Sequence, residues 1–139
     1  MSVLLDTSFV IALKNPRDAD HARALARFRE MLQGIHGALF STNVVFAEAV
    51  TMARVRMRRF TAAVGVGEFF FSAYDGKPLV RLQHLTPPQL TAAWAEYRRH
   101  EDKELSLVDW ASVAVARDLE LDAIASFDEG FDGIYPRLL

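Results

Sequence analysis

The chain has 139 residues, 51% of them hydrophobic and 24% charged, with a formal net charge of −2; this is typical of one globular domain, spanning residues 1–139, and excludes a disordered chain. It contains no cysteine, which excludes disulfides, thiolate zinc sites and cysteine nucleophiles. No export signal opens the sequence and no apolar run approaches the roughly 20 residues that span a membrane, so we expect a cytoplasmic protein without a membrane partner.

The first half of the sequence predicts two short buried strands, each followed by a pair of helices. Brief apolar runs predict strands over residues 3–5 and 38–41. Helical spacing of apolar residues predicts helices over 7–14, 19–33, 43–59 and 62–73, the first of them ended by the segment NPRD at 15–18. Strands that alternate with helices indicate an α/β fold.

The second half contains the clearest helix start in the chain. After a predicted strand over 79–82, Thr86 stands at an N-cap position, Pro87 follows at the first helical position, and Gln89 completes a capping box. We expect this helix to run to about residue 100, a further helix over 106–119 and a strand over 122–126. Residues 134–139 could add a short edge strand, in which Pro136 is tolerable.

Two acids directly follow predicted strands, and two more lie on apolar helix faces. Strands that read as continuous apolar runs indicate a parallel sheet covered on both faces, and ligands of such folds bind beyond the carboxyl ends of the strands. Asp6 follows the first strand and Asp128 the fourth, so we expect both at this edge. Glu48 and Asp109 lie among apolar residues at helical spacing, where burial of an acid is costly unless something compensates it.

Three of these acids also have a purely structural explanation. Asp6 could cap the helix that begins at residue 7. Asp109 stands three residues after Ser106, which is capping-box spacing, and the same spacing at positions 126 and 129 would make Asp128 a first-turn acid. Glu48, in the middle of a helix, has no such explanation. Capping and metal binding are compatible, so both interpretations stay open.

The chemistry of such a cluster follows from its charge. Several carboxylates brought together repel one another, which raises their pKa values unless a cation lies among them. All-oxygen ligation suits Mg²⁺ or Mn²⁺, and the four scattered histidines form no zinc-binding pattern. Hard cations held by few carboxylates keep bound waters and room for a phosphate oxygen. The acids therefore predict hydrolysis of a phosphodiester or a phosphomonoester.

Three segments carry these acids: LLDTSFVIAL at 4–13, TNVVFAEAV at 42–50, and LSLVDWASVAVARDLELDAIASFDEGFD at 105–132. In order and separation they resemble the signature blocks of the PIN domain, and length and motif style resemble the VapC-type toxins of bacterial toxin–antitoxin pairs. The resemblance implies a three-layer α/β/α sandwich around a central, mainly parallel sheet of four to five strands. It also implies an endoribonuclease site, dependent on Mg²⁺ or Mn²⁺, at the carboxyl edge of that sheet.

Carried over by matching block, the implied catalytic and metal-binding acids are Asp6, Glu48, Asp109 and Asp128. Asp132 matches a less constant acid of the family. The supporting hydroxyls implied near the metal are Thr7, Ser8 and Ser126. The implied partners are an RNA substrate, a second copy of the chain in a homodimer, and a cognate antitoxin. We expect the antitoxin to cover the carboxylate pocket and to supply a basic side chain in place of metal charge.

Outside these blocks, Arg54 and Arg58 lie one turn apart, downstream of Glu48. They could clamp RNA phosphates, or they could simply form a solvated helix end. The segment EFFF at 68–71, with Tyr74, is expected to be core or a dimer or antitoxin surface. Two other functions stay open: a PIN nuclease of housekeeping RNA processing without an antitoxin, and a non-catalytic binding module. In a binding module, loss of Glu48 would be nearly harmless.

Overall fold

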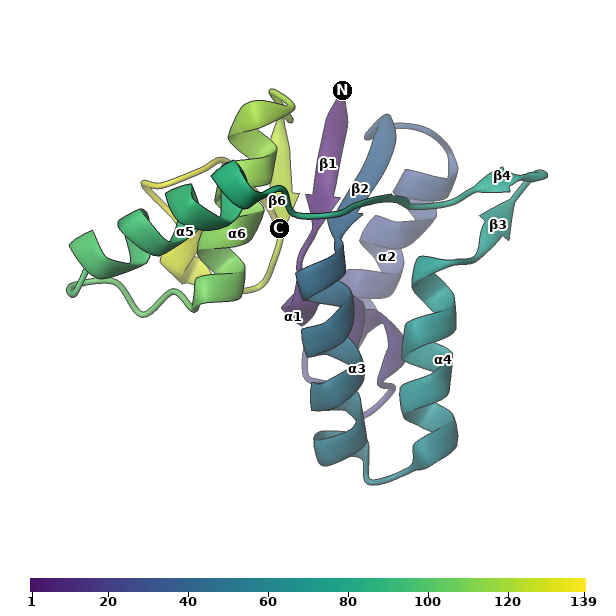
Figure 1. Cartoon of the computed structure of the whole chain (residues 1–139). Coiled ribbons are helices and arrows are strands. Elements are labelled where there is room, and N and C mark those ends of the chain that lie inside the picture. The colour runs from purple at the N-terminus through teal and green to yellow at the C-terminus, as the bar shows by residue number, and fades with distance from the viewer.

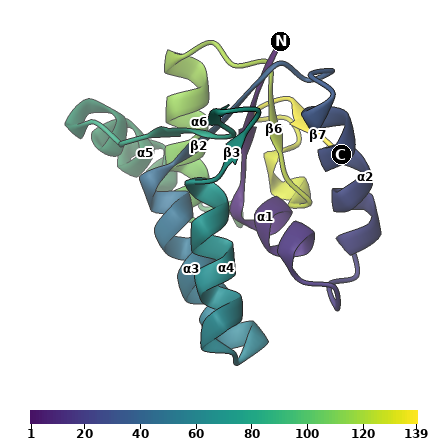
Figure 2. The same cartoon turned by 90° about the vertical axis from the view of Figure 1, so that its right-hand side faces the viewer.

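The computed structural model describes all 139 residues, and its centre is a five-stranded sheet with helices on both faces (Figures 1 and 2). The strand order is β5-β2-β1-β6-β7, and every pairing within this sheet is parallel. The strands are β1 (Ser2–Leu5), β2 (Ala38–Thr42), β5 (Arg81–Gln83), β6 (Ala123–Ala125) and β7 (Arg137–Leu138). The predicted three-layer α/β/α sandwich is therefore confirmed, including an edge strand directly after Pro136.

Six helices cover the sheet, and none is long and apolar enough to cross a membrane. They are α1 (Thr7–Lys14), α2 (His21–Leu32), α3 (Asn43–Met57), α4 (Phe60–Phe70), α5 (Pro87–Arg99) and α6 (Leu107–Asp118). Helices α1 to α4 share one hydrophobic core, and α5 and α6 share the other. In Figure 1 the hairpin of α3 and α4 extends well beyond the carboxyl ends of the strands.

Strand β1 explains why the sequence shows no alternation of polar and apolar residues. It lies in the middle of the sheet, and its side chains go alternately to the two cores. Val3 and Leu5 pack in the core under α1 to α4, whereas Leu4 packs in the core under α5 and α6. A strand buried on both faces needs apolar residues at every position.

The strand register brings the ends of β1 and β6 to the same level. Leu5 is the partner of Ala125, so Asp6 and Ser126 follow at neighbouring positions. The backbone N–H of Asp6 also donates to the carbonyl of Ala125, at 3.1 Å. The parallel arrangement thus places the first residue after each strand at one edge of the sheet, as the strand-end rule predicts.

One region differs from the prediction. The helix expected over 62–73 ends at Phe70, and a small hairpin follows, made of β3 (Ala73–Tyr74) and β4 (Lys77–Pro78). Its turn is Asp75-Gly76, with φ of +52° and +73°. Asp-Gly is a favoured pair for such tight hairpin turns because both residues must adopt positive φ. The hairpin delays the next strand, which begins at Arg81 and not at 79.

Candidate active site

Asp6 is buried at the end of β1, with a relative exposure of 2%. It occupies the N-cap position of α1, but its side chain makes no capping hydrogen bond, so the capping explanation is wrong for this residue. Its Oδ2 accepts a hydrogen bond from Ser126 Oγ at 2.7 Å. Its Oδ1 is buried without any hydrogen-bond partner. A buried carboxylate oxygen without a partner is costly, and it indicates a missing ligand.

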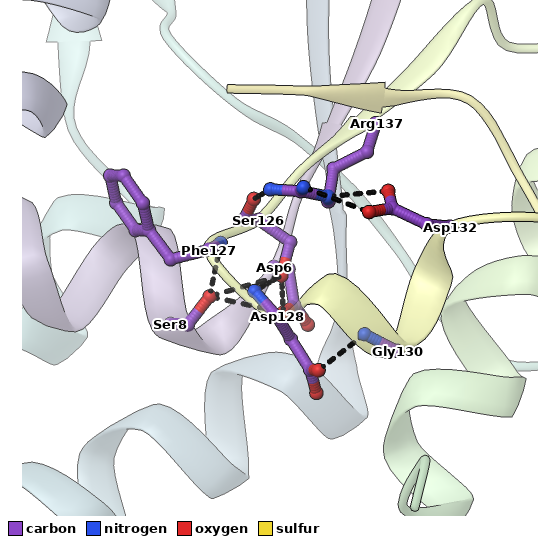
Figure 3. Close-up of polar contacts among 8 residues, drawn as sticks. All are labelled: Asp6, Ser8, Ser126, Phe127, Asp128, Gly130, Asp132 and Arg137. Atoms are coloured by element: carbon purple, nitrogen blue, oxygen red, sulfur yellow. Dashed lines mark hydrogen bonds and ion pairs between the residues drawn. The ribbon is translucent and has the colours of Figure 1, made fainter. Parts of the chain in front are cut away.

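Two of the predicted supporting hydroxyls hold this carboxylate in place (Figure 3). Ser126 Oγ donates to Asp6 Oδ2 at 2.7 Å, Ser8 Oγ lies 3.4 Å from the same oxygen, and the two hydroxyl oxygens are 3.0 Å apart. Ser126 Oγ also accepts from the backbone N–H of Asp128 at 3.0 Å, and Ser8 Oγ accepts from that of Phe127 at 2.9 Å. The two hydroxyls therefore join the ends of β1 and β6. The third predicted hydroxyl, on Thr7, is buried without a partner.

Asp128 precedes a short 3-10 helix, η1 (Glu129–Phe131), and its Oδ1 accepts from the backbone N–H of Gly130 at 2.8 Å. Asp128 is thus the N-cap residue of η1. The alternative, in which a capping box between positions 126 and 129 makes Asp128 a first-turn acid, is wrong. Sequence reasoning missed the role of Gly130. A Cβ added there would lie 3.0 Å from Asp128 Oδ1 and 2.9 Å from Leu105 Cδ2, so only glycine fits without a shift of these side chains.

Asp109 is both a helix cap and a member of the acid cluster. The capping box is present: Asp109 Oδ2 accepts from the Ser106 N–H at 2.8 Å, and Ser106 Oγ accepts from the Asp109 N–H at 3.1 Å. The box occupies only one oxygen of a carboxylate that is itself buried. Asp109 therefore caps α6 and still has a second carboxylate oxygen outside the capping box.

Glu48 lies half-buried on α3 and has no capping role. The hydroxyl of Thr42 caps α3 by accepting from the N–H of Val45 at 3.0 Å, so this helix begins directly at the carboxyl end of β2. Glu48 lines a shallow pocket of about 390 Å³, together with Thr51 and other residues of α3 and with Val108 of α6. The acid is therefore open to a ligand on the side that faces α6.

The electrostatics show that the structure brings the four predicted acids together. Burial, followed by the nearby charges of Asp109 and Glu48, raises the pKa of Asp6 to about 7. Burial also raises the pKa of Asp109 to about 6, against the hydrogen bonds from Ser106 and with the charges of Asp128 and Glu48. Carboxylates from three separate segments of the chain thus repel one another at a single site. Acids with pKa values raised in this way are typical of functional sites.

No three His, Asp or Glu side chains already form a ready-made metal site. The donor set nevertheless fits a hard divalent cation, because its ligands are carboxylate oxygens and one oxygen of Asp6 is buried without a partner. A cation would also remove the mutual repulsion of the acids. The residues that would hold it are Asp6, Glu48, Asp109 and Asp128.

The remaining predicted residues lie outside this cluster. Asp132 forms a bidentate ion pair with Arg137, and the hydrogen bond from Arg137 lowers the pKa of Asp132. Arg54 lines an apolar groove between α3 and α4, and Arg58 is the exposed C-cap of α3 in the left-handed conformation. Sequence reasoning did not single out Arg137. A salt bridge over five residues between a loop and an edge strand leaves no periodic signal.

A family profile described as the PIN domain matches residues 3–135. The chain is 30% identical over 129 residues to the 23S rRNA-specific endonuclease VapC20 of Mycobacterium tuberculosis, covering 93% of this chain and 91% of that protein. The crystal structure of M. tuberculosis VapC20, described as a Sarcin-Ricin loop cleaving toxin, superposes with a TM-score of 0.82 at 30% identity, covering 94% and 93% of the two chains.

Two more distant structures share the fold. FitAcB from Neisseria gonorrhoeae has a TM-score of 0.67 at 19% identity, covering 99% and 96% of the two chains. VapBC2 from Rickettsia felis, solved with a DNA fragment from the promoter, has a TM-score of 0.69 at 12% identity, covering 99% and 98%. The profile match over residues 3–135 and the 30% identity to VapC20 over nearly the full length show that the chain belongs to the PIN-domain family and is a homologue of VapC-type ribonuclease toxins.

Proposed function

We propose that this protein is a Mg²⁺- or Mn²⁺-dependent endoribonuclease that acts as the toxin of a toxin–antitoxin pair. The observation that carries the proposal is the unpartnered, buried oxygen of Asp6 among three further acids. A divalent cation bound there would lower the pKa of the attacking water and stabilise the leaving oxygen of a phosphodiester. The relationship to VapC20 supports RNA as the substrate.

The chain's own residues prepare the site before any cation binds. Ser126 and Ser8 hold the Asp6 carboxylate in one orientation, and the Ser106 box holds Asp109. Without a cation, Asp6 keeps a proton near neutral pH because its pKa is raised to about 7. Binding of the cation would release this proton and give all four acids their charged form. The four acids would then hold the cation in the position from which it contacts the substrate phosphate and the water.

The α3–α4 hairpin supports an antitoxin partner. An apolar groove of about 800 Å³ lies between these helices, and Val55, Phe60 and Phe71 are each more than two-thirds exposed along it. Thr51 lines both this groove and the pocket that contains Glu48. One polypeptide segment could therefore bind the groove through apolar side chains and reach the acids with a basic one. We propose that the antitoxin inhibits in this way.

A homodimer is the third part of the proposal, and α5 is its candidate surface. Leu90, Trp94 and Tyr97 are exposed along this helix, and the rings of Trp94 and Tyr97 stack with centroids 5.7 Å apart. Light scattering of the wild type and of Trp94→Glu tests the surface. A dimer that becomes a monomer in the variant supports it, and a monomeric wild type contradicts it.

Cleavage of RNA by the purified protein tests the activity. 23S rRNA, the substrate in the name of VapC20, would be compared with other structured RNAs in Mg²⁺ or Mn²⁺, with EDTA and with the variant Asp109→Asn. Asparagine keeps the shape and the capping oxygen but removes the charge. Cuts that need the metal and disappear in the variant support the proposal. Cuts that persist in the variant contradict the assigned site. If the wild type makes no cuts and Glu48→Gln leaves the Mn²⁺ affinity unchanged, the protein is better described as a binding module.

A further inference from the structure

Arg137, on the edge strand β7, bridges both ends of the segment that carries Asp128. Its Nε and Nη2 donate to Oδ1 and Oδ2 of Asp132 at 2.8 and 3.1 Å. Its Nη1 donates to the backbone carbonyl of Ser126 at 3.2 Å. Ser126 and Asp132 are the first and last residues of the segment 126–132, so a single guanidinium closes this loop.

The bridged residues connect Arg137 to the acid cluster. The hydroxyl of Ser126 holds Asp6 and accepts from the N–H of Asp128, while the carbonyl of the same residue accepts from Arg137. Figure 3 shows the guanidinium on one side of the segment and the carboxylate of Asp128 on the other. A displacement of Ser126 would therefore move both Asp6 and Asp128. The charge of Asp128 also acts on Arg137, which makes Arg137 a resident cation behind the cluster.

Asp132 already has a cationic partner in this arrangement. Both of its carboxylate oxygens accept hydrogen bonds from Arg137, in the bidentate geometry that is the strongest for this kind of pair. A metal cation at Asp132 would lie beside the positive charge of Arg137, which opposes its binding. We infer that Arg137 is a positioning residue for the acid site and that Asp132 acts through Arg137 and does not ligate the metal, an inference that rests on the proposed nuclease function.

Strand β7 explains why an arginine can act from this position. Ile124 pairs with Arg137 and Ala125 with Leu138, so β7 runs beside the strand that ends at Ser126. The Arg137 side chain is only 16% exposed, whereas that of Asp132 is 56% exposed. An ion pair with one such exposed partner contributes little to global stability. Variants of this pair should therefore fold, and their effect should appear at the site.

A double-mutant cycle tests the inference. Arg137→Gln, Asp132→Asn and the double variant would be compared for kcat and KM of RNA cleavage, for Mn²⁺ affinity by calorimetry and for melting temperature. Arg99→Gln is the matched control, because Arg99 forms a surface ion pair with Glu96 on α5. We expect Arg137→Gln to lower kcat by about 10-fold with KM nearly unchanged, since a misplaced catalytic group loses rate before it loses binding. The kcat of the double variant should be no lower than that of Arg137→Gln alone, because both changes remove the same Arg137–Asp132 ion pair.

The alternatives give different patterns. If Asp132→Asn weakens Mn²⁺ binding by 10-fold or more while Arg137→Gln does not, Asp132 is a ligand and the inference is wrong. Additive losses in the double variant also contradict it. Arg137→Lys, which can keep the charge but not three directed bonds, should recover only part of the rate.

The proposed function can fail separately from this inference. If the wild type cleaves no RNA, the function fails, and the Mn²⁺ affinities still decide the role of Arg137. A lower affinity in Arg137→Gln than in the wild type and in Arg99→Gln then supports positioning, and equal affinities contradict it.

Discussion

Two cavities adjoin α3, the pocket of Glu48 and the groove between α3 and α4, and they differ in the kind of ligand that they suit. Glu48 lines a pocket beside the acid cluster, in which Asp6 and Asp109 are buried and are held by hydroxyls and backbone N–H groups. The groove between α3 and α4 is apolar, about 800 Å³, and lined by phenylalanine and valine side chains that remain in contact with solvent. The acid cluster carries an excess of negative charge, and the groove exposes apolar side chains without a partner.

The comparison shows two ways in which a fold gives up stability for function. Buried like charges oppose folding until a cation binds, and exposed apolar surface gains free energy only when a partner covers it. Because the two cavities share Thr51, they are adjacent, yet they depend on different interactions. Variants in the groove should therefore leave cleavage intact, and variants of the acids should leave the apolar contact with the antitoxin intact.

The largest expected effect is at the acid site. Asp109→Asn should reduce cleavage by about 10³-fold, because it removes one charge from a metal-dependent phosphoryl-transfer site while keeping the cap. Binding of the antitoxin through the groove should persist, since Asp109 does not line the groove. Cleavage assays and a pull-down with the antitoxin measure the two properties. Loss of both together would mean that the two cavities form one functional unit.

The reverse effect is expected in the groove. Val55→Ser combined with Phe60→Ser should weaken inhibition by the antitoxin about 30-fold or more, since loss of apolar anchors at an interface costs about 2 kcal/mol or more. The rate of cleavage without antitoxin should stay that of the wild type, because both side chains are exposed and neither lines the pocket of Glu48. Titration of the antitoxin into the cleavage assay gives both numbers. A variant that is inhibited as strongly as the wild type excludes the groove.

A smaller effect is expected from a residue that touches Asp128 without any chemistry of its own. Gly130→Ala should lower kcat about 10-fold, because the new Cβ lies 3.0 Å from Asp128 Oδ1 and must displace it or Leu105. Gly65→Ala on α4 is the matched control, since a Cβ there meets nothing within 4 Å. Wild-type kinetics in Gly130→Ala would show that the position of Asp128 tolerates a shift.

The smallest effect is on stability, and its sign follows from the raised pKa values. Asp6 and Asp109, at about 7 and 6, bind protons more tightly in the folded than in the unfolded state, where the value is 3.8. Their protonated forms therefore stabilise the fold below about pH 4, and this contribution is lost as pH rises through 6 to 7. Without metal, the melting temperature should fall by on the order of 5 °C between pH 5 and pH 8.

Scanning calorimetry with and without Mn²⁺ measures this effect. Mn²⁺ should reverse the fall at pH 8, where the acids are charged, and have little effect at pH 5. Asp109→Asn should show a shallower fall than the wild type. A melting temperature that rises with pH in the metal-free protein would mean that the acids are not coupled as described.

Much of the fold follows from local signals. The capping boxes at Thr86 and Ser106 and the apolar runs of β1, β2 and β6 were all found by sequence reasoning, since each depends on residues close together in the chain. The Asp75-Gly76 hairpin also has a local signal, but the continuous apolar residues before it favoured a longer helix. The place of the acids at one sheet edge followed from the strand-end rule.

The sequence by itself thus determined the α/β fold and the four acids that form the cluster. Only the tertiary structure decided which partner each side chain takes: that Asp6 binds Ser126 and leaves the cap empty, that Gly130 must leave room for Leu105, and that Arg137 engages Asp132. The physical reason is that caps and periodicity act within a few residues, whereas hydrogen bonds across the sheet depend on the register of strands more than a hundred residues apart.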